Sequence, residues 1–124
     1  MAASIGSILE PYTSQKRELV FVAHDTKQDV KLLHKIGVDV LALPGMVGDV
    51  DTAVLHQAWC SSDMTRGLHS VLTDLCISSK HLHNAGNDAV YTMRAMVGLA
   101  VEKARRDEAA QKGEEYVPAL WTAS

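Results

Sequence analysis

The sequence has few of the features that mark secreted or membrane-spanning proteins. Its 124 residues include only two cysteines, Cys60 and Cys76, far fewer than a disulfide-built fold uses, so we expect reduced thiols and an intracellular protein. No run of about 18 apolar residues is present, so no membrane-spanning helix is predicted. The first residues lack a basic segment followed by a long apolar core, so no secretory signal peptide is predicted either.

An excess of positive charge, internal repeats and the common glycine-rich phosphate loops are also absent from the sequence. The formal net charge of −3 argues against a protein that coats nucleic acid non-specifically, but it leaves room for a metal site, which needs carboxylates. The sequence is 47% hydrophobic and 22% charged, which predicts one folded domain rather than a disordered chain.

Strand and helix patterns alternate along the first part of the chain. The apolar run Leu19–Ala23 indicates a buried strand of a parallel sheet. An amphipathic helix is predicted over Asp29–Ile36, with Asp25 or Thr26 as its N-cap, and a short strand over Val38–Leu43. The outer face of this helix carries lysines four residues apart, which are either a solvated face or a track for a phosphate backbone: Lys27, Lys31 and Lys35.

The rest of the chain carries a second strand signal over Val50–Leu55 and helical patterns over Thr65–Ile77 and Asp88–Arg106. A weak helix over Ser4–Glu10 is expected to stop or kink at Pro11. This order predicts an α/β domain with a parallel pair of strands, which needs at least one more strand or a partner to cover it.

Three groups of polar residues stand at the ends of these elements: His24 to Asp29, Asp51–Thr52, and His81 to Asp88. The first group follows the predicted strand, where open α/β sheets bind ligands. Each group also has a simpler interpretation as a turn, a helix cap or a first-turn acid. A zinc site is not predicted, because the cysteines and the nearby His81 and His83 match no standard spacing. Cysteine-based catalysis is not predicted, because nothing in the sequence marks either thiol as activated.

Taken in order, these stretches resemble the DEDDh 3′–5′ exonucleases of the RNase H-like superfamily. Val22–Asp29 (VAHDTKQD) resembles their second motif, Asp51–Thr52 their Asp–Thr pair, and His83–Asp88 their His–x4–Asp third motif. Gly67–Leu72 resembles their helix with a Leu–x–x–Leu pattern. The amino-acid sequence of Leu82–Thr92 (LHNAGNDAVYT) is most similar to that of the fungal Gfd-type RNase H-like domains, which are linked to mRNA export.

This resemblance implies roles for individual residues. Asp29 and Asp88 would hold Mg²⁺ or Mn²⁺, and His83 would be the general base that activates the attacking water. Further residues would line the binding site beside them: His24, Asp51, Thr52, Asn84 and Asn87.

The first motif of that family, Asp–x–Glu on the first strand of an antiparallel meander, is missing from residues 1–18, where Glu10 and Glu18 stand alone. We therefore predict an incomplete RNase H-like fold of the α/β class, with parallel strands flanked by helices and without the N-terminal meander. The expected organisation is an N-terminal segment over residues 1–18, a core over 19–106, and a charged then apolar tail over 107–124 whose end docks on the protein.

Without the first-motif carboxylates, we expect the chain alone to be non-catalytic and to bind a single-stranded nucleic acid or a protein. The alternative is an active exonuclease whose missing carboxylates come from a partner chain, or from Glu10 or Glu18. A plain α/β interaction domain is the third interpretation. The uncovered edge of the predicted strand Leu19–Ala23 favours a homodimer or a stable protein partner in each case.

Overall fold

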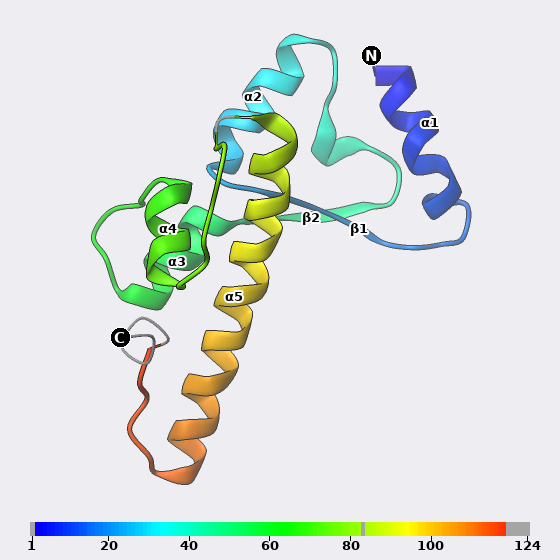
Figure 1. Ribbon diagram of the computed structural model, residues 1–124. Helices are drawn as coiled ribbons and strands as arrows, with labels where there is room; N and C mark the ends of the chain where they lie inside the picture. The colour runs from blue at the N-terminus through cyan, green and yellow to red at the C-terminus, as the bar shows by residue number, and fades with distance from the viewer. Residues whose placement is uncertain (1, 83, 119–124) are drawn as a thin grey trace. The chain divides into compact units, whose positions relative to one another are not determined.

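Helices and two parallel strands make up the mixed α/β fold of the computed structural model, which describes residues 2–82 and 84–118 (Figure 1). The chain divides into two units, residues 1–51 and 52–124. The parallel strands flanked by helices confirm the predicted α/β class and are consistent with a partial RNase H-like fold. In the described ranges, no helix combines the length and apolar content needed to cross a bilayer.

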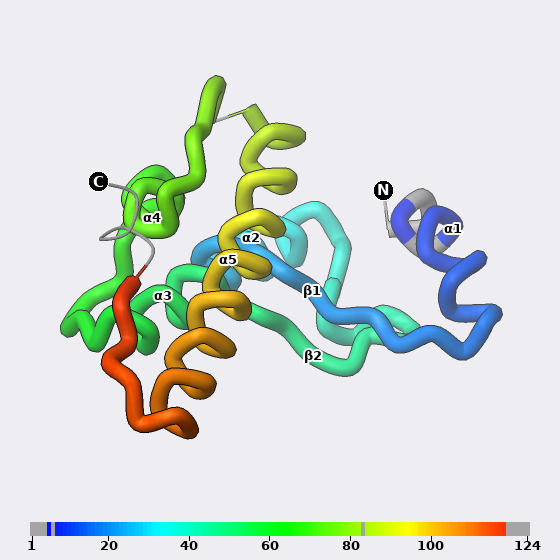
Figure 2. The backbone as a smooth tube through the Cα atoms, turned by 60° about the horizontal axis from the view of Figure 1, so that its bottom comes forward, coloured from blue at the N-terminus to red at the C-terminus, as the bar shows by residue number. Residues whose placement is uncertain are grey.

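The first unit is built on β1 (Leu19–Ala23) and β2 (Met46–Asp51), which pair in parallel and run side by side in Figure 2. The register places Ala23 opposite Asp51, so both carboxyl ends lie at the same edge. The predicted strand Leu19–Ala23 is thus confirmed, but the prediction that it is buried is wrong, since Val20 is 51% exposed and Ala23 is its one buried residue. The second strand ends at Asp51 instead of running on to Leu55, because the buried Thr52, Ala53 and His56 recur at helical spacing.

Helix α2 (Thr26–Lys35) follows β1 and begins three residues earlier than the predicted Asp29–Ile36. The strand predicted over Val38–Leu43 is wrong, since Val40–Ala42 forms a short 3-10 turn, labelled η1. Val38 and Val40 are both buried and Asp39 between them is exposed, which is the alternation typical of a strand. Gly37, with φ +87°, turns the chain there and the two valines pack inward from a turn.

Helix α1 (Ala2–Thr13) precedes β1 and contains Pro11 without ending there. Of the two outcomes predicted at Pro11, a stop or a kink, the stop is therefore wrong. The chain leaves the helix two residues after the proline, where the hydroxyls of Thr13 and Ser14 each donate to a carbonyl oxygen three residues back, at 3.2 Å. These bonds add donors to the carbonyl oxygens of Glu10 and Pro11 in the last turn of the helix, where carbonyl groups run out of helical N–H donors.

The second unit consists of α3 (Thr52–Cys60), α4 (Leu68–Asp74) and α5 (Ala85–Lys112). Its core is a cluster of buried side chains from α4, the residue after it, and α5: Val71, Leu72, Leu75, Ala95 and Leu99. Helix α4 is shorter than the predicted Thr65–Ile77, whereas α5 runs past Arg106 without a break and ends at Gly113, whose φ of +68° is the left-handed C-cap conformation.

Tyr116 of the predicted docking tail packs against this unit. Its hydroxyl donates to Glu102 at 2.5 Å and accepts from the Trp59 indole N–H at 3.0 Å. The Arg106 guanidinium lies 4.9 Å from the centre of the tyrosine ring. Leu120 and Trp121, which were also expected to dock, lie outside the described residues.

Candidate functional site

Polar side chains gather at the carboxyl ends of the two strands in the first unit. We call His24, Asp25, Asp29 and Asp51 the carboxyl-end cluster. Asp51 ends β2, and its Oδ1 and Oδ2 accept the backbone N–H groups of Asp25 and Thr26 at 2.9 and 3.0 Å. The N-terminus of α2 is therefore capped across the sheet by Asp51, whereas Asp25, at the N-cap position, makes no side-chain capping bond to a described residue.

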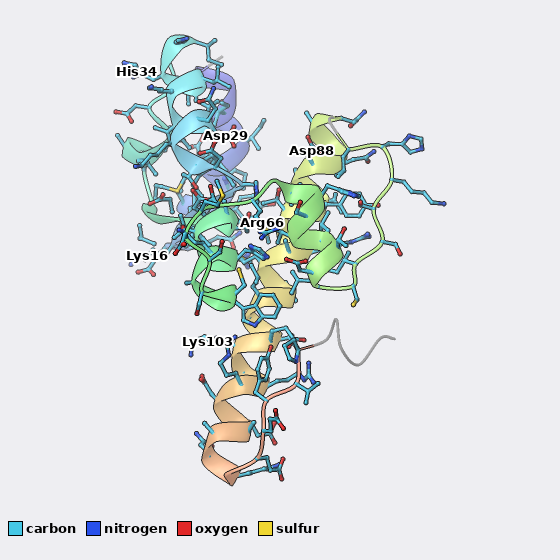
Figure 3. The ribbon with its side chains drawn as sticks, turned by 90° about the vertical axis from the view of Figure 1, so that its left-hand side faces the viewer. Lys16, Asp29, His34, Arg66, Asp88 and Lys103 are labelled. Atoms are coloured by element: carbon cyan, nitrogen blue, oxygen red, sulfur yellow. The ribbon has the colours of Figure 1, made fainter. Side chains whose placement is uncertain are left out.

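Asp29 lies on the first turn of α2, half-buried beside these carboxylates (Figure 3). Burial raises the pKa of its carboxyl group above the usual 3.8, and the negative charges of Asp25 and Asp51 raise this pKa further. The charge of His24 opposes them and lowers the pKa of Asp29. The environment of Asp29 thus destabilises its ionised carboxylate. Binding of a cation or of a proton would remove this destabilisation.

Two threonines beside the cluster are buried. Thr52, predicted as a binding residue, is fully buried at the first position of α3 and presents no surface to solvent. Thr26 is 4% exposed, and its hydroxyl has no hydrogen-bond partner among residues 2–82 and 84–118. A buried hydroxyl without a partner costs about 1–3 kcal/mol, so the start of α2 has a polar group left to be satisfied.

Three further predicted residues, Asn84, Asn87 and Asp88, lie at the start of α5 in the second unit. Asn84 is the N-cap, and its Oδ1 accepts the backbone N–H groups of Gly86 and Asn87 at 3.1 and 3.3 Å. The Asn87 amide donates to the carbonyl oxygen of His81 at 3.2 Å. Both asparagines thus act as the turn and helix-cap residues of the simpler interpretation, and their hydrogen bonds order this turn.

Asp88 is half-buried on the first turn of α5, where Figure 3 labels it at the end of the helix. A carboxylate at this position is stabilised by the helix dipole. The predicted general base, His83, lies outside the described residues. The structure therefore brings His24, Asp29 and Asp51 together in one unit, and Asn84, Asn87 and Asp88 together in the other.

A divalent metal was expected at Asp29 and Asp88. Within residues 2–82 and 84–118, no group of three or more His, Cys, Asp or Glu side chains is arranged to hold a metal ion. Both oxygens of Asp51 already accept backbone N–H groups. The described side chains thus do not by themselves fit the two-ion site that the resemblance implies.

A depression of about 520 Å³ lies elsewhere in the first unit, beside α1 and the amino ends of the strands. Its lining includes Glu10, Glu18 and Val47, and it includes none of the carboxyl-end cluster. This depression and the clustered carboxylates are therefore separate features.

One group of side chains was missed by the sequence reasoning: His56, Cys60 and Asp74 in the second unit. His56 is fully buried, and its Nε2 lies 2.8 Å from Asp74 Oδ2. The signal was present in the four-residue spacing of His56 and Cys60, which places them on one face of a helix. The strand predicted over Val50–Leu55 gives no reason to look for helical spacing at His56, so this signal is easily missed.

Comparison with known proteins complements this geometry. A family model described as DNA polymerase III subunit epsilon-like, C-terminal domain, matches residues 1–99. The matched range contains the carboxyl-end cluster and Asp88. No curated protein matches the chain significantly.

Proposed function

Because the chain belongs to the family of DNA polymerase III subunit epsilon-like C-terminal domains, in the DEDDh exonuclease superfamily, we propose that it is an exonuclease-like domain that binds single-stranded nucleic acid without cleaving it alone. The observation that carries this proposal is the carboxyl-end cluster, which lies where open α/β sheets bind ligands yet forms no three-ligand metal group with other described residues.

The lysines of α2 support nucleic acid as the ligand. Lys27, Lys31 and Lys35 are all exposed, and they follow one face of the helix that starts at the carboxyl-end cluster. Lysines spaced by one helical turn present a row of positive charge, which is suited to successive backbone phosphates. An ordinary solvated face is the competing interpretation, and binding measurements separate the two.

The test is fluorescence anisotropy with a labelled single-stranded RNA and DNA at several salt concentrations. Exchanging Lys27 and Lys31 for Gln removes two positive charges, so we expect weaker binding and a salt slope smaller by about 1.4, at about 0.7 per phosphate contact. The matched control exchanges Lys103 and Lys112, exposed lysines of α5, for Gln. Equal losses in the two double variants, or no binding by the unmodified chain, would contradict the proposal.

The alternative function is an active two-metal exonuclease that uses Mg²⁺ or Mn²⁺ and takes its missing carboxylates from a partner chain. The raised pKa of Asp29 favours this alternative, because a bound cation would stabilise the ionised carboxylate. Glu10 and Glu18 are poor substitutes, since both line the depression at the amino ends of the strands. With β1 spanning five residues at about 3.3 Å each, the two ends lie roughly 13–16 Å apart.

A nuclease assay distinguishes these functions. Labelled single-stranded RNA and DNA are incubated with the chain in Mg²⁺ or Mn²⁺, beside Asp29→Asn, His83→Ala and Asp88→Asn. The proposal expects no degradation by any of the proteins. Degradation that all three substitutions abolish would establish the alternative, and it would give His83 and Asp88 the roles that the family resemblance implies.

The finer placement of the chain is also part of the proposal. The amino-acid sequence of Leu82–Thr92 supports a relationship to the fungal Gfd-type RNase H-like domains. The free thiols of Cys60 and Cys76 support action inside the cell. The β1–β2 sheet supports a homodimer, because in the described part of the chain each strand has only one neighbour.

A further inference from the structure

Three side chains of the second unit form a continuous polar chain that ends at an exposed thiol. His56 and Cys60 lie one turn apart on α3, and Asp74 is the last residue of α4. The Nε2 of His56 is 2.8 Å from Asp74 Oδ2, and its Nδ1 is 3.8 Å from Cys60 Sγ. The imidazole therefore connects a carboxylate on one side to a thiol on the other.

The Asp74 carboxylate determines which imidazole nitrogen carries the proton, and so leaves the nitrogen that faces the thiol free to act as a base. An ionised carboxylate only accepts hydrogen bonds, so the His56 nitrogen that faces Asp74 is the one that carries the proton. In the neutral ring, Nδ1 then holds a lone pair that faces Cys60 Sγ at 3.8 Å, and the carbonyl oxygen of Gln57, 3.9 Å from the same sulfur, is a second acceptor for the thiol proton. This is the arrangement of an activated nucleophile: a thiol, a base in reach of it, and a third group that orients the base.

Burial holds this arrangement in place. His56 is 0% exposed, and its ring centre lies 6.0 Å from that of Trp59. The ring is thus enclosed by protein and is oriented by Asp74. Cys60, in contrast, is an exposed residue of α3, open to molecules from solvent.

We propose that Cys60 is a modification site for soft electrophiles of the α,β-unsaturated carbonyl class, with His56 as the base and Asp74 as a positioning residue. The sulfur electron pair forms an S–C bond to the β-carbon, and the electrons of the C=C bond move to the α-carbon. His56 Nδ1 takes the thiol proton and returns it to the α-carbon, so the thiol adds across the double bond without a leaving group. The Asp74 carboxylate stabilises the transient imidazolium.

The second cysteine is an internal control. Cys76 is also exposed and free, and no hydrogen bond of its sulfur to a described residue is present. The experiment treats the full chain with a limiting amount of N-ethylmaleimide at pH 7 and follows each cysteine by peptide mass spectrometry. We expect Cys60 to react at least tenfold faster than Cys76. Equal rates, or a faster Cys76, would overturn the proposal without any variant.

Variants then assign the roles. His56→Gln is expected to lower the Cys60 rate about tenfold and to leave the Cys76 rate unchanged. Asp74→Asn keeps the shape of the side chain but removes its charge, so it should lower the Cys60 rate, and Asp74→Glu should restore it. A variant that unfolds is recognised by loss of its helical circular dichroism signal and by a change in the Cys76 rate. A folded His56→Gln protein with an unchanged Cys60 rate would overturn the role of His56.

Discussion

At the scale of single residues, Asp51 links the two strands to helix α2. Its carboxylate joins the end of β2 to the start of α2 through two charge-assisted hydrogen bonds. The sequence indicated Asp25 or Thr26 as the cap, since both stand next to the helix in the chain. A residue 25 positions away supplies the cap instead, because the parallel pairing brings the two carboxyl ends to one edge.

Removal of this cap should destabilise the first unit. Asp51→Ala leaves the N–H groups of Asp25 and Thr26 without their acceptor, so we expect unfolding at lower urea concentration and a loss of about 1–2 kcal/mol. The matched control is Asp49→Ala, an exposed carboxylate on the same strand, which should change stability by less than about 0.5 kcal/mol. Equal midpoints for the two variants would refute the capping role.

Asp29 should have the opposite effect on stability. Its raised pKa means that the folded state holds the proton more tightly than the unfolded state does. This contribution is fully present below the ordinary pKa of 3.8 and is lost as the pH rises through the higher folded value. Asp29→Asn should therefore stabilise the protein at pH 7, with a smaller gain at pH 4.5. Urea midpoints at the two pH values measure this, and a destabilised variant at pH 7 would contradict it.

At the scale of elements, the second unit depends on the apolar face of α4 against α5. Leu72 is 0% exposed in the core cluster. Leu72→Ala should cost about 2–5 kcal/mol, since it removes buried methyl groups and leaves a cavity. Leu55→Ala, at a 39% exposed position on α3, is the control and should cost far less. Calorimetric unfolding compares the two variants, and a similar melting temperature for both would place the core elsewhere.

The segment that holds Tyr116 is a second element-scale contact. Tyr116→Phe removes the hydroxyl that bonds Trp59 and Glu102 and leaves the buried Glu102 with Arg105 as its remaining described ion-pair partner. We expect a loss of about 1–2 kcal/mol in urea unfolding. Tyr91→Phe, which loses one exposed hydrogen bond from Lys80, should have a smaller effect. A larger effect at Tyr91 would contradict this.

At the scale of the whole molecule, the two-stranded sheet predicts self-association. Val20 on β1 and Val47 on β2 are 51% and 58% exposed. We expect light scattering after size exclusion to give twice the mass of one chain at micromolar concentration. Val20→Lys with Val47→Lys should shift the mass toward one chain, because charge blocks pairing at a strand edge. Val101→Lys, on α5, is the control, and a monomeric unmodified chain would refute the dimer.

Sequence reasoning succeeded where the signal is local. The β-branched run Leu19–Ala23 is a strand because its side chains suit a pleated surface, and the order of short motifs led to the DEDDh superfamily that the family match supports. It failed over Val38–Leu43, where Val38 and Val40 alternate as in a strand but pack from a turn, and over Val50–Leu55, where the apolar stretch is too short to separate a strand from a helix.

The sequence by itself thus determined the α/β class, the first strand, the DEDDh superfamily and the list of polar residues at element ends. Only the tertiary structure decided how those side chains are used. Asp51 caps a helix, Asn84 and Asn87 order a turn, and His56 joins Asp74 to Cys60. The physical reason is that capping and hydrogen bonding depend on distances of about 3 Å between groups far apart in the chain, which only folding brings within reach.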